Sequence, residues 1–204
     1  MDWLEYENTA YADGYEIVCG VDEAGRGPLA GPVYAAAVIL PKGHIIEGVN
    51  DSKKLSEKKR DELFDKVIDE CTAYSVGIAT EQEIDEINIL QATFLAMRRA
   101  VEGLNVKPDI ALIDGNKTPG LAIAQRAIVK GDGKSANIAA ASIIAKVSRD
   151  RYMLEMAAKY PEYQFEKHKG YGTKLHYEML EKYGVSPIHR KTFLRKFFEQ
   201  RENK

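Results

Sequence analysis

The stretch that most restricts the fold of this chain is residues 17–28, IVCGVDEAGRGP. Its first half is a short apolar run rich in β-branched residues, which is typical of a buried strand. The run then reaches two adjacent acids, Asp22 and Glu23, followed by Gly-Arg-Gly. Strands disfavour Asp, and neighbouring anions repel each other. A functional site therefore explains this string better than a strand that merely ends in a polar turn.

A divalent cation beside a phosphate group accounts for these residue types. Mg²⁺ and similar hard cations bind carboxylate oxygens. Arg26 carries a rigid fork of donors that fits phosphate, and the flanking Gly25 and Gly27 let a backbone come close to a ligand. Because successive residues of a strand point to opposite faces, Asp22 and Glu23 can share a metal site only where the strand ends.

Two later stretches carry the same combination of acid and glycine. Residues 109–115, DIALIDG, form a second apolar run that ends in an acid, and residues 130–134 read KGDGK. If the strands around residues 17–22 and 109–115 are parallel neighbours, their acids meet at the carboxyl edge, where α/β sheets bind ligands. A cluster of carboxylates repels itself unless cations join it. We therefore expect one or two divalent cations bound by Asp22, Glu23, Asp114 and Asp132.

Composition narrows the class of protein. The 204 residues are 45% hydrophobic, which suits one domain with a substantial core. We expect a cytoplasmic protein, by default a monomer, because the chain shows neither a transmembrane run nor a signal-peptide core and its two cysteines are too few for a disulfide framework. The first 114 residues carry 11 Lys and Arg against 22 Asp and Glu, whereas the remainder carries 18 against 9. The basic C-terminal part indicates a surface for a polyanion.

The pattern of apolar residues predicts an α/β fold with a mixed central sheet flanked by helices. The expected division is a core over residues 1–160 and a small C-terminal helical portion over residues 161–204, together one domain. We expect strands at residues 17–22, 33–40, 73–79, 109–115 and about 122–129. We expect helices at residues 1–14, 56–70, 89–104 and 135–159, a short one after residue 80, another after Thr173, and a last one that opens at Pro187.

Six strings, in this order along nearly the whole chain, resemble bacterial ribonuclease HII: VDEAGRGPLAGPV, NDSKKLS, LIDGN, KGDGKS followed by AAASIIAKVSRDR, HKGYGT and SPIHRKTF. The resemblance implies a ribonuclease-H-like fold and an endonuclease that uses Mg²⁺ or Mn²⁺. It implies cleavage of RNA in RNA–DNA hybrids and, on the 5′ side, at single ribonucleotides embedded in duplex DNA. Such an enzyme acts in primer removal and ribonucleotide excision during DNA replication and repair.

Carried over position by position, the resemblance makes the four acids the catalytic metal ligands. It implies that Gly25, Arg26 and Gly27 recognise the ribonucleotide 2′-hydroxyl and the junction phosphate, and that Tyr171 stacks on the following deoxyribose. The 2′-hydroxyl is the group that distinguishes RNA from DNA at a given site. Further candidate substrate contacts are Ser52, Lys53, Lys146, Arg149 and Lys169; solvated side chains without such a role are the alternative.

Asp132 has a rival in Asp150, which lies in the string SRDR. Asp150 is expected to form an ion pair with Arg149 or Arg151 instead of binding metal. The expected reaction is two-metal-ion phosphodiester hydrolysis that leaves 5′-phosphate and 3′-hydroxyl ends. The alternatives are another nuclease or recombinase on the same fold, a hybrid-binding module without catalysis, and a phosphatase for small substrates.

Overall fold

A five-stranded mixed sheet forms the centre of the computed structural model, which describes residues 2–49 and 55–202. The strands lie in the order β3-β2-β1-β4-β5. The pairs β1–β2 and β2–β3 are antiparallel, whereas β1–β4 and β4–β5 are parallel. This confirms the predicted mixed sheet. The strands are β1 (Val18–Ala24), β2 (Val33–Ile39), β3 (Ala73–Ala79), β4 (Ile110–Asp114) and β5 (Ala124–Ile128).

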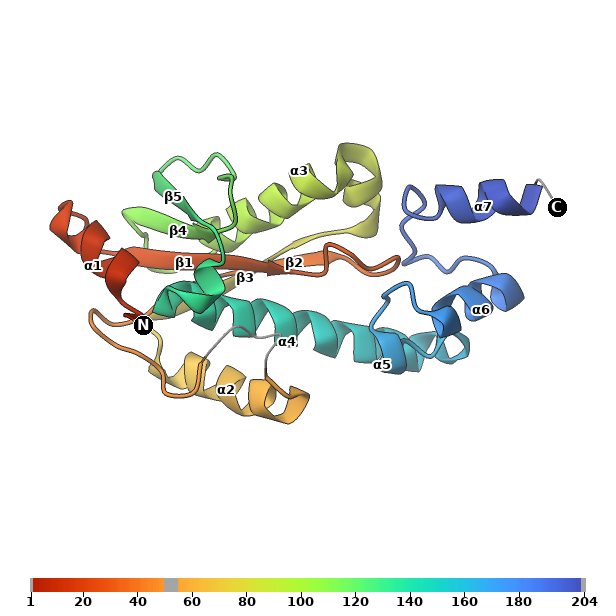
Figure 1. The fold of residues 1–204 in the computed structure, drawn as a ribbon, viewed down its shortest axis with the longest axis horizontal. Helices are drawn as coiled ribbons and strands as arrows, with labels where there is room; N and C mark the ends of the chain where they lie inside the picture. The colour runs from red at the N-terminus through yellow and green to blue at the C-terminus, as the bar shows by residue number, and fades with distance from the viewer. Residues whose placement is uncertain (1, 50–54, 203–204) are drawn as a thin grey trace.

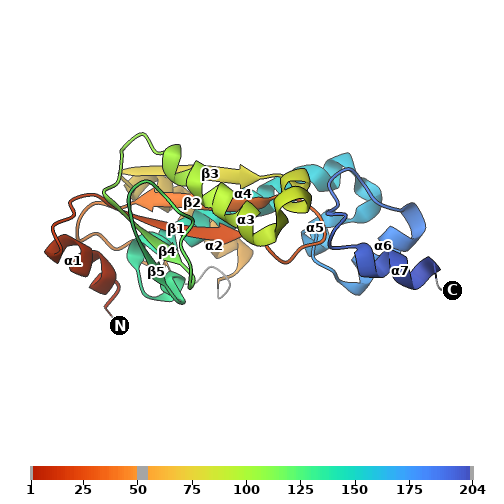
Figure 2. The same ribbon diagram turned by 90° about the horizontal axis from the view of Figure 1, so that it is seen from above.

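Helices cover both faces of the sheet (Figure 1). α3 (Glu81–Glu102) lies on one face and α4 (Ala136–Lys159) on the other, and α2 (Glu57–Glu70) packs on the outer side of α4. Seen from above, α3 lies over the sheet, and α1 (Glu5–Ala12) lies at the end of the molecule opposite the C-terminus (Figure 2). The sheet is thus a central layer between two apolar cores, which accounts for its long runs of buried residues.

Two glycines allow the helices to approach the sheet closely. A Cβ atom on Gly20 of β1 would lie 2.1 Å from the backbone carbonyl carbon of Asn137 in α4. A Cβ atom on Gly77 of β3 would lie 2.1 Å from the carbonyl oxygen of Ala96 in α3. Because side chains do not tolerate such separations, both contacts require glycine. Gly20 therefore fixes the distance between β1 and α4, the two elements that carry or adjoin the candidate acids.

Side-chain caps explain where the long helices begin. Ser56, Thr80 and Ser135 each accept a hydrogen bond from a backbone amide in the first turn of α2, α3 and α4. The sequence predicts two helices after Thr80, and α3 consists of two helical segments that meet at a kink just before Ile89, which confirms this prediction. At the kink, Asn88 adopts a φ of 67°, and its side chain accepts hydrogen bonds from the amides of Leu90 and Gln91. Asn88 thus caps the second segment from inside the helix.

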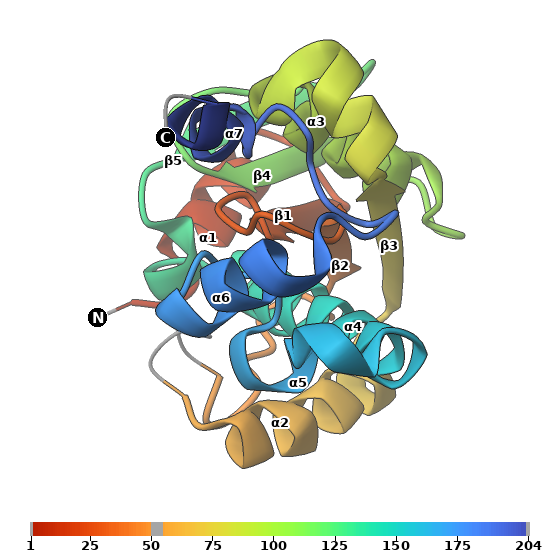
Figure 3. The ribbon, with the colours of Figure 1, turned by 90° about the vertical axis from the view of Figure 1, so that its right-hand side faces the viewer.

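The C-terminal part lies beyond one end of the sheet, as the view along the long axis shows (Figure 3). It consists of η3 (Pro161–Tyr163), α5 (Phe165–His168), α6 (Lys174–Tyr183) and α7 (Arg195–Glu202). The prediction that the last helix opens at Pro187 is wrong, because the chain first pairs His189 with Ala30 in an isolated β-bridge and turns before α7 begins. The division of the chain at residue 160 stays a prediction. No described helix is both long and apolar enough to cross a membrane.

Candidate active site

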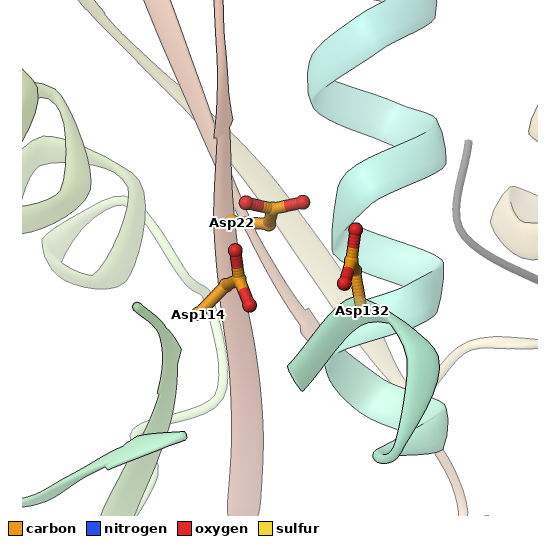
Figure 4. A group of neighbouring side chains, drawn as sticks. All are labelled: Asp22, Asp114 and Asp132. Atoms are coloured by element: carbon orange, nitrogen blue, oxygen red, sulfur yellow. The ribbon is translucent and has the colours of Figure 1, made fainter. Parts of the chain in front are cut away.

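Three aspartates far apart in the sequence meet at one edge of the sheet (Figure 4). Asp22 lies near the end of β1, Asp114 ends β4, and Asp132 lies in η2 (Gly131–Gly133), the short helix that precedes α4. Their carboxylates turn toward one another, and one oxygen from each lies within 4.8 Å of the others. The parallel pairing of Val21 with Ile113 places the ends of β1 and β4 side by side, as the sequence predicts.

Hydrogen bonds hold two of these carboxylates. The backbone amide of Glu23 donates to Asp22 Oδ1 at 2.7 Å, and the amide of Gly131 donates to Asp114 Oδ1 at 2.6 Å. Burial raises the pKa of Asp22 well above its ordinary value, and the negative charges of Glu23 and Asp114 raise it further, against the hydrogen bonds from the Glu23 amide and Ser142. A buried cluster of like charges is stabilised by a bound cation, and oxygen donors at this spacing fit Mg²⁺ or Mn²⁺.

Glu23 lies on the opposite face of the sheet from Asp22. Strand β1 continues through Ala24, so the alternation of side chains sends Glu23 toward α3 and Asp22 toward α4. The structure thus brings three of the four predicted acids into one cluster, with Glu23 beside it. Glu23 and Asp114 line the same cavity of about 290 Å³, together with residues of α3. Whether Glu23 binds a cation stays a prediction.

The loop between β1 and β2 borders this cavity. Arg26 lines it, and Arg26 Nη1 lies 3.6 Å from Glu23 Oε1, with about half of the arginine side chain exposed. Gly25 has a φ of +94°, and a Cβ atom there would lie 2.0 Å from Nε of Arg149. A Cβ atom on Gly27 would lie 3.7 Å from Cε1 of Tyr171. The predicted Gly25–Gly27 loop and the predicted stacking residue Tyr171 are therefore neighbours, although Gly27 and Tyr171 are 144 positions apart in the chain.

Arg149 differs from the expectation of a phosphate contact, because its side chain is fully buried. It donates to the carbonyl oxygens of Ala30 at 3.2 Å, Pro32 at 3.3 Å and Lys169 at 3.1 Å. The guanidinium also lies 5.8 Å from the centre of the Tyr171 ring. Arg149 therefore joins the loop after β1 to the loop that carries Tyr171, which is a positioning role.

A second buried arginine, Arg190, was not among the predicted site residues. It donates to the carbonyl oxygens of Gly25 at 2.6 Å, Arg26 at 2.9 Å and Gly31 at 2.8 Å. Burial and the nearby Arg149 charge together lower the pKa of Arg190 to about 9, which still leaves the guanidinium charged at neutral pH. The string SPIHRKTF contains Arg190, but charge alone places an arginine on the surface, and only the fold reveals that it is buried.

Asp150 forms an ion pair, as expected, but with other partners. Lys146 Nζ lies 2.6 Å from Asp150 Oδ1 and Arg60 Nη2 lies 3.9 Å from Oδ2, so the prediction of Arg149 or Arg151 as its partner is wrong. Asp150 is therefore not part of the aspartate cluster.

The remaining predicted contacts lie at the edge of this region. Tyr171 is 43% exposed. Lys169 Nζ donates to the carbonyl of Glu166 and lies 3.8 Å from Glu57. Burial lowers the pKa of Lys146, and its pairing with Asp150 opposes this effect. Ser52 and Lys53 lie outside the described residues.

Comparison with known proteins agrees with this geometry. A family model described as Ribonuclease HII matches residues 19–200. The chain belongs to the ribonuclease HII family. It is therefore a nuclease, and so a hydrolase.

Individual relatives show how far the likeness extends. A Ribonuclease HII from Caldicellulosiruptor bescii is 60% identical over 194 residues, which are 95% of this chain and 94% of that protein. The crystal structure of ribonuclease H2 from Pyrococcus horikoshii has a TM-score of 0.77 at 33% identity and covers 93% of this chain and all of that one. Bst-RNase HIII in complex with Mn²⁺ has a TM-score of 0.70 at 19% identity, over 86% of this chain and 65% of that one. The fold is the ribonuclease-H-like fold that the motifs predict.

Proposed function

We propose that this protein is a divalent-cation-dependent endonuclease that hydrolyses RNA in RNA–DNA hybrids and cuts 5′ of single ribonucleotides in duplex DNA. Family membership supports the general activity, and one arrangement supports the site. Asp22, Asp114 and Asp132 converge beside a glycine-rich loop that carries an exposed arginine. The proposed products carry 5′-phosphate and 3′-hydroxyl ends, which suits primer removal and ribonucleotide excision.

The aspartates would hold one or two cations, with Glu23 as a candidate fourth ligand. Bound Mg²⁺ or Mn²⁺ supplies the positive charge that activates the attacking water and offsets charge on the leaving oxygen. Without a bound cation, the carboxylates of Asp22 and Asp114 already accept hydrogen bonds from the amides of Glu23 and Gly131, which fix their orientation. Such preorganisation lowers the cost of assembling the reacting groups.

The loop after β1 would read the ribonucleotide. Glycines at positions 25 and 27 leave backbone groups open to a 2′-hydroxyl, which is the feature that separates RNA from DNA. Arg26 would contact the phosphate at the junction, and Tyr171 would stack on the next deoxyribose. Lys146 and Lys169 would contribute contacts to the nucleic-acid backbone that weaken with salt.

The test uses a labelled DNA duplex with one internal ribonucleotide, incubated with Mg²⁺, with Mn²⁺ and with a chelator. We expect a single cut 5′ of the ribonucleotide with either cation and none with chelator. An RNA–DNA hybrid should be cut at many positions, and an all-DNA duplex should stay intact. An uncut strand under both cation conditions would refute the proposal, and equal cutting of all-DNA duplex would favour a different nuclease.

An aspartate variant links the activity to the cluster. Asp22→Asn should reduce cutting to background while binding of the duplex persists, because the backbone contacts remain. Asp13→Asn is the matched control, since Asp13 forms an exposed ion pair with Arg126 and does not belong to the aspartate cluster. Cutting by Asp22→Asn at the wild-type rate would remove this residue from the catalytic site.

A further inference from the structure

Three buried histidines meet behind Tyr171. His168 ends α5, His176 lies in the first half of α6, and His189 lies in the turns before α7, and their exposed fractions are 6%, 0% and 4%. The rings of His168 and His176 stack with centroids 4.3 Å apart, and Phe165 packs against all three. None of these rings reaches the aspartate cluster, so the proposed chemistry does not explain them.

His189 and His176 form a chain of hydrogen bonds from Ser186 to Tyr171, called the histidine relay below. The partners in this chain determine which nitrogen of each ring carries the hydrogen. The amide and the hydroxyl of Ser186 lie 2.8 and 2.7 Å from His189 Nδ1, so this nitrogen accepts and Nε2 carries the hydrogen. His189 Nε2 lies 2.9 Å from His176 Nε2, which must therefore accept. His176 Nδ1 then carries the hydrogen and donates to the carbonyl oxygen of Tyr171 at 2.9 Å. Both rings are neutral in this arrangement, and their tautomers are opposite.

The third histidine holds the residue before Tyr171. The amide of Gly170 donates to His168 Nδ1 at 3.2 Å, so His168 Nε2 carries the hydrogen and donates to the carbonyl of Tyr163 at 3.0 Å. Gly170 has a φ of +85°, and its carbonyl accepts the amide of Leu29 at 2.8 Å. The backbone on both sides of Tyr171 is thus fixed by imidazole groups.

The electrostatic setting keeps the relay neutral. The pKa of His189 is lowered to about 3, mainly by burial and also by the neighbouring His176 and His168, and the pKa of His176 is lowered to about 4 by burial and by His168. Burial also lowers the pKa of His168, with Glu166 raising it and Lys169 lowering it. At neutral pH the hydrogen-bond directions described above therefore persist.

The relay also connects Tyr171 to the loop that would read the ribonucleotide. His189 pairs with Ala30 in a β-bridge, and the amide of Gly31 donates to the carbonyl of Ile188 at 2.8 Å. The segment around His189 thus contacts the β1–β2 loop on one side and, through His176, Tyr171 on the other. The distance between Gly27 and the Tyr171 ring depends on both contacts.

We propose that His176 and His189 are positioning residues that set the backbone of Tyr171 relative to the Gly25–Gly27 loop, and so govern the preference for RNA–DNA junctions. This inference rests on the proposed function. The histidines touch neither the scissile phosphate nor a cation; they act through Tyr171. Loss of the Tyr171 contact should therefore weaken cutting at single ribonucleotides more than cutting within long hybrids, which offer no deoxyribose after most cut sites.

Two substitutions of His176 each remove one of its two hydrogen bonds and keep the other. In His176→Gln the side-chain amide can meet His189 Nε2 but no longer donates to Tyr171. In His176→Asn the amide can donate to Tyr171 but no longer meets His189. We expect His176→Gln to lower kcat/KM on a single-ribonucleotide duplex about fivefold to tenfold, the effect of one lost hydrogen bond, mainly through KM. His176→Asn keeps the donor to Tyr171 but breaks the contact with His189, so it should lower kcat/KM by a smaller factor, about twofold to threefold, when compared at equal folded fraction.

A double variant distinguishes positioning from general loss of stability. In a Tyr171→Ala background, His176→Gln should have no further effect on junction preference, because the group it positions is gone. An equal effect of His176→Gln with and without the Tyr171 ring would overturn the inference, and so would a His176→Gln enzyme with unchanged preference. Circular dichroism and thermal melting establish the folded fraction of each variant.

A readout independent of activity separates this inference from the proposed function. Nitrogen-15 NMR of the imidazoles should show a protonated Nε2 in His189 and a protonated Nδ1 in His176 at pH 7. The reverse assignment would refute the relay even in an active enzyme. If wild-type protein cuts no ribonucleotide-containing substrate but the tautomers are as assigned, the proposed function fails while the relay stands.

Discussion

The guanidinium of Arg190 donates to the carbonyl oxygens of Gly25 and Arg26, which lie 165 and 164 positions earlier in the chain. This contact ties the C-terminal part to the β1–β2 loop from behind. Together with Arg149 it places two positive charges directly under the backbone that would meet a phosphate group. A loop rich in glycine would otherwise be free to move, so the two arginines supply the rigidity that its own residues lack.

Replacement of Arg190 by lysine should destabilise the protein. A lysine keeps the charge but does not reproduce three donors aimed at three carbonyls, so buried acceptors lose their partners. We expect a loss of about 2–4 kcal/mol in the free energy of unfolding, measured by urea denaturation. Arg126→Lys, at an exposed ion pair with Asp13, should change it by less than about 1 kcal/mol. Equal effects of the two substitutions would contradict the positioning role.

Asp22→Asn should stabilise the cation-free protein. The raised pKa of Asp22 means that burial and neighbouring charges disfavour its ionised form at neutral pH, and asparagine removes that charge. In the presence of a chelator we expect a gain on the order of 1 kcal/mol, seen as a higher Tm. Addition of Mn²⁺ should raise the Tm of the wild type but not that of the variant. A lower Tm for the variant in the presence of chelator would show that the buried charge of Asp22 does not destabilise the cation-free protein.

Gly20→Ala should separate the sheet from α4. The new methyl group would lie 2.1 Å from the Asn137 carbonyl carbon, which cannot move without shifting the start of α4 and with it Asp132. We expect a loss of about 3 kcal/mol or more, measured by thermal or urea denaturation. At Gly133 a methyl group would meet nothing within 4 Å, so Gly133→Ala should cost less than about 1 kcal/mol.

Acid should weaken the fold through the buried histidines. His176 and His189 have pKa values of about 4 and about 3 in the folded protein, below the ordinary histidine value. Between these pKa values and the ordinary one, the unfolded chain binds protons that the folded protein does not. The free energy of unfolding therefore falls as the pH drops from about 6.5 toward 4. Above about pH 6.5 this contribution is complete. We expect a loss on the order of 3 kcal/mol for each of the two histidines over that window, measured by urea denaturation at each pH.

Replacing one histidine tests the origin of that pH dependence. His189→Gln should flatten the curve between about pH 6.5 and 4, because one titrating group is gone. An equally steep curve in this variant would assign the acid sensitivity to other groups.

The sequence predicts the parts of the fold that depend on local pattern. The strand at residues 73–79 and the helices near residues 56–70 and 135–159 agree with the structure within a residue or two, because alternation, helical spacing and cap residues act locally. The meeting of Asp22 with Asp114 also follows from sequence, since both end apolar runs and parallel strands align their ends. Asp132 joins them from a turn that a glycine on each side allows.

Other features depend on contacts that no local pattern encodes. The sequence predicts the boundary between the two helical segments of α3, but not that they join directly at Asn88, whose own side chain caps the second segment. The segment after Pro187 has helical composition, yet His189 pairs with Ala30 in a β-bridge and the segment is not helical there. Arg149 and Arg190 look like surface cations in sequence, and only the folded chain brings six carbonyl oxygens around them.

The bridge from Arg190 back to Gly25 has a consequence for a chain still emerging from the ribosome. All three aspartates are synthesised well before Arg190, so a nascent chain can gather its acids while the reading loop still lacks its support. In the proposed function, the acid cluster would therefore assemble before the loop that selects the cut site is fixed. If the proposed function is right, discrimination between ribose and deoxyribose would depend on Arg190 having left the ribosome and folded back onto the loop.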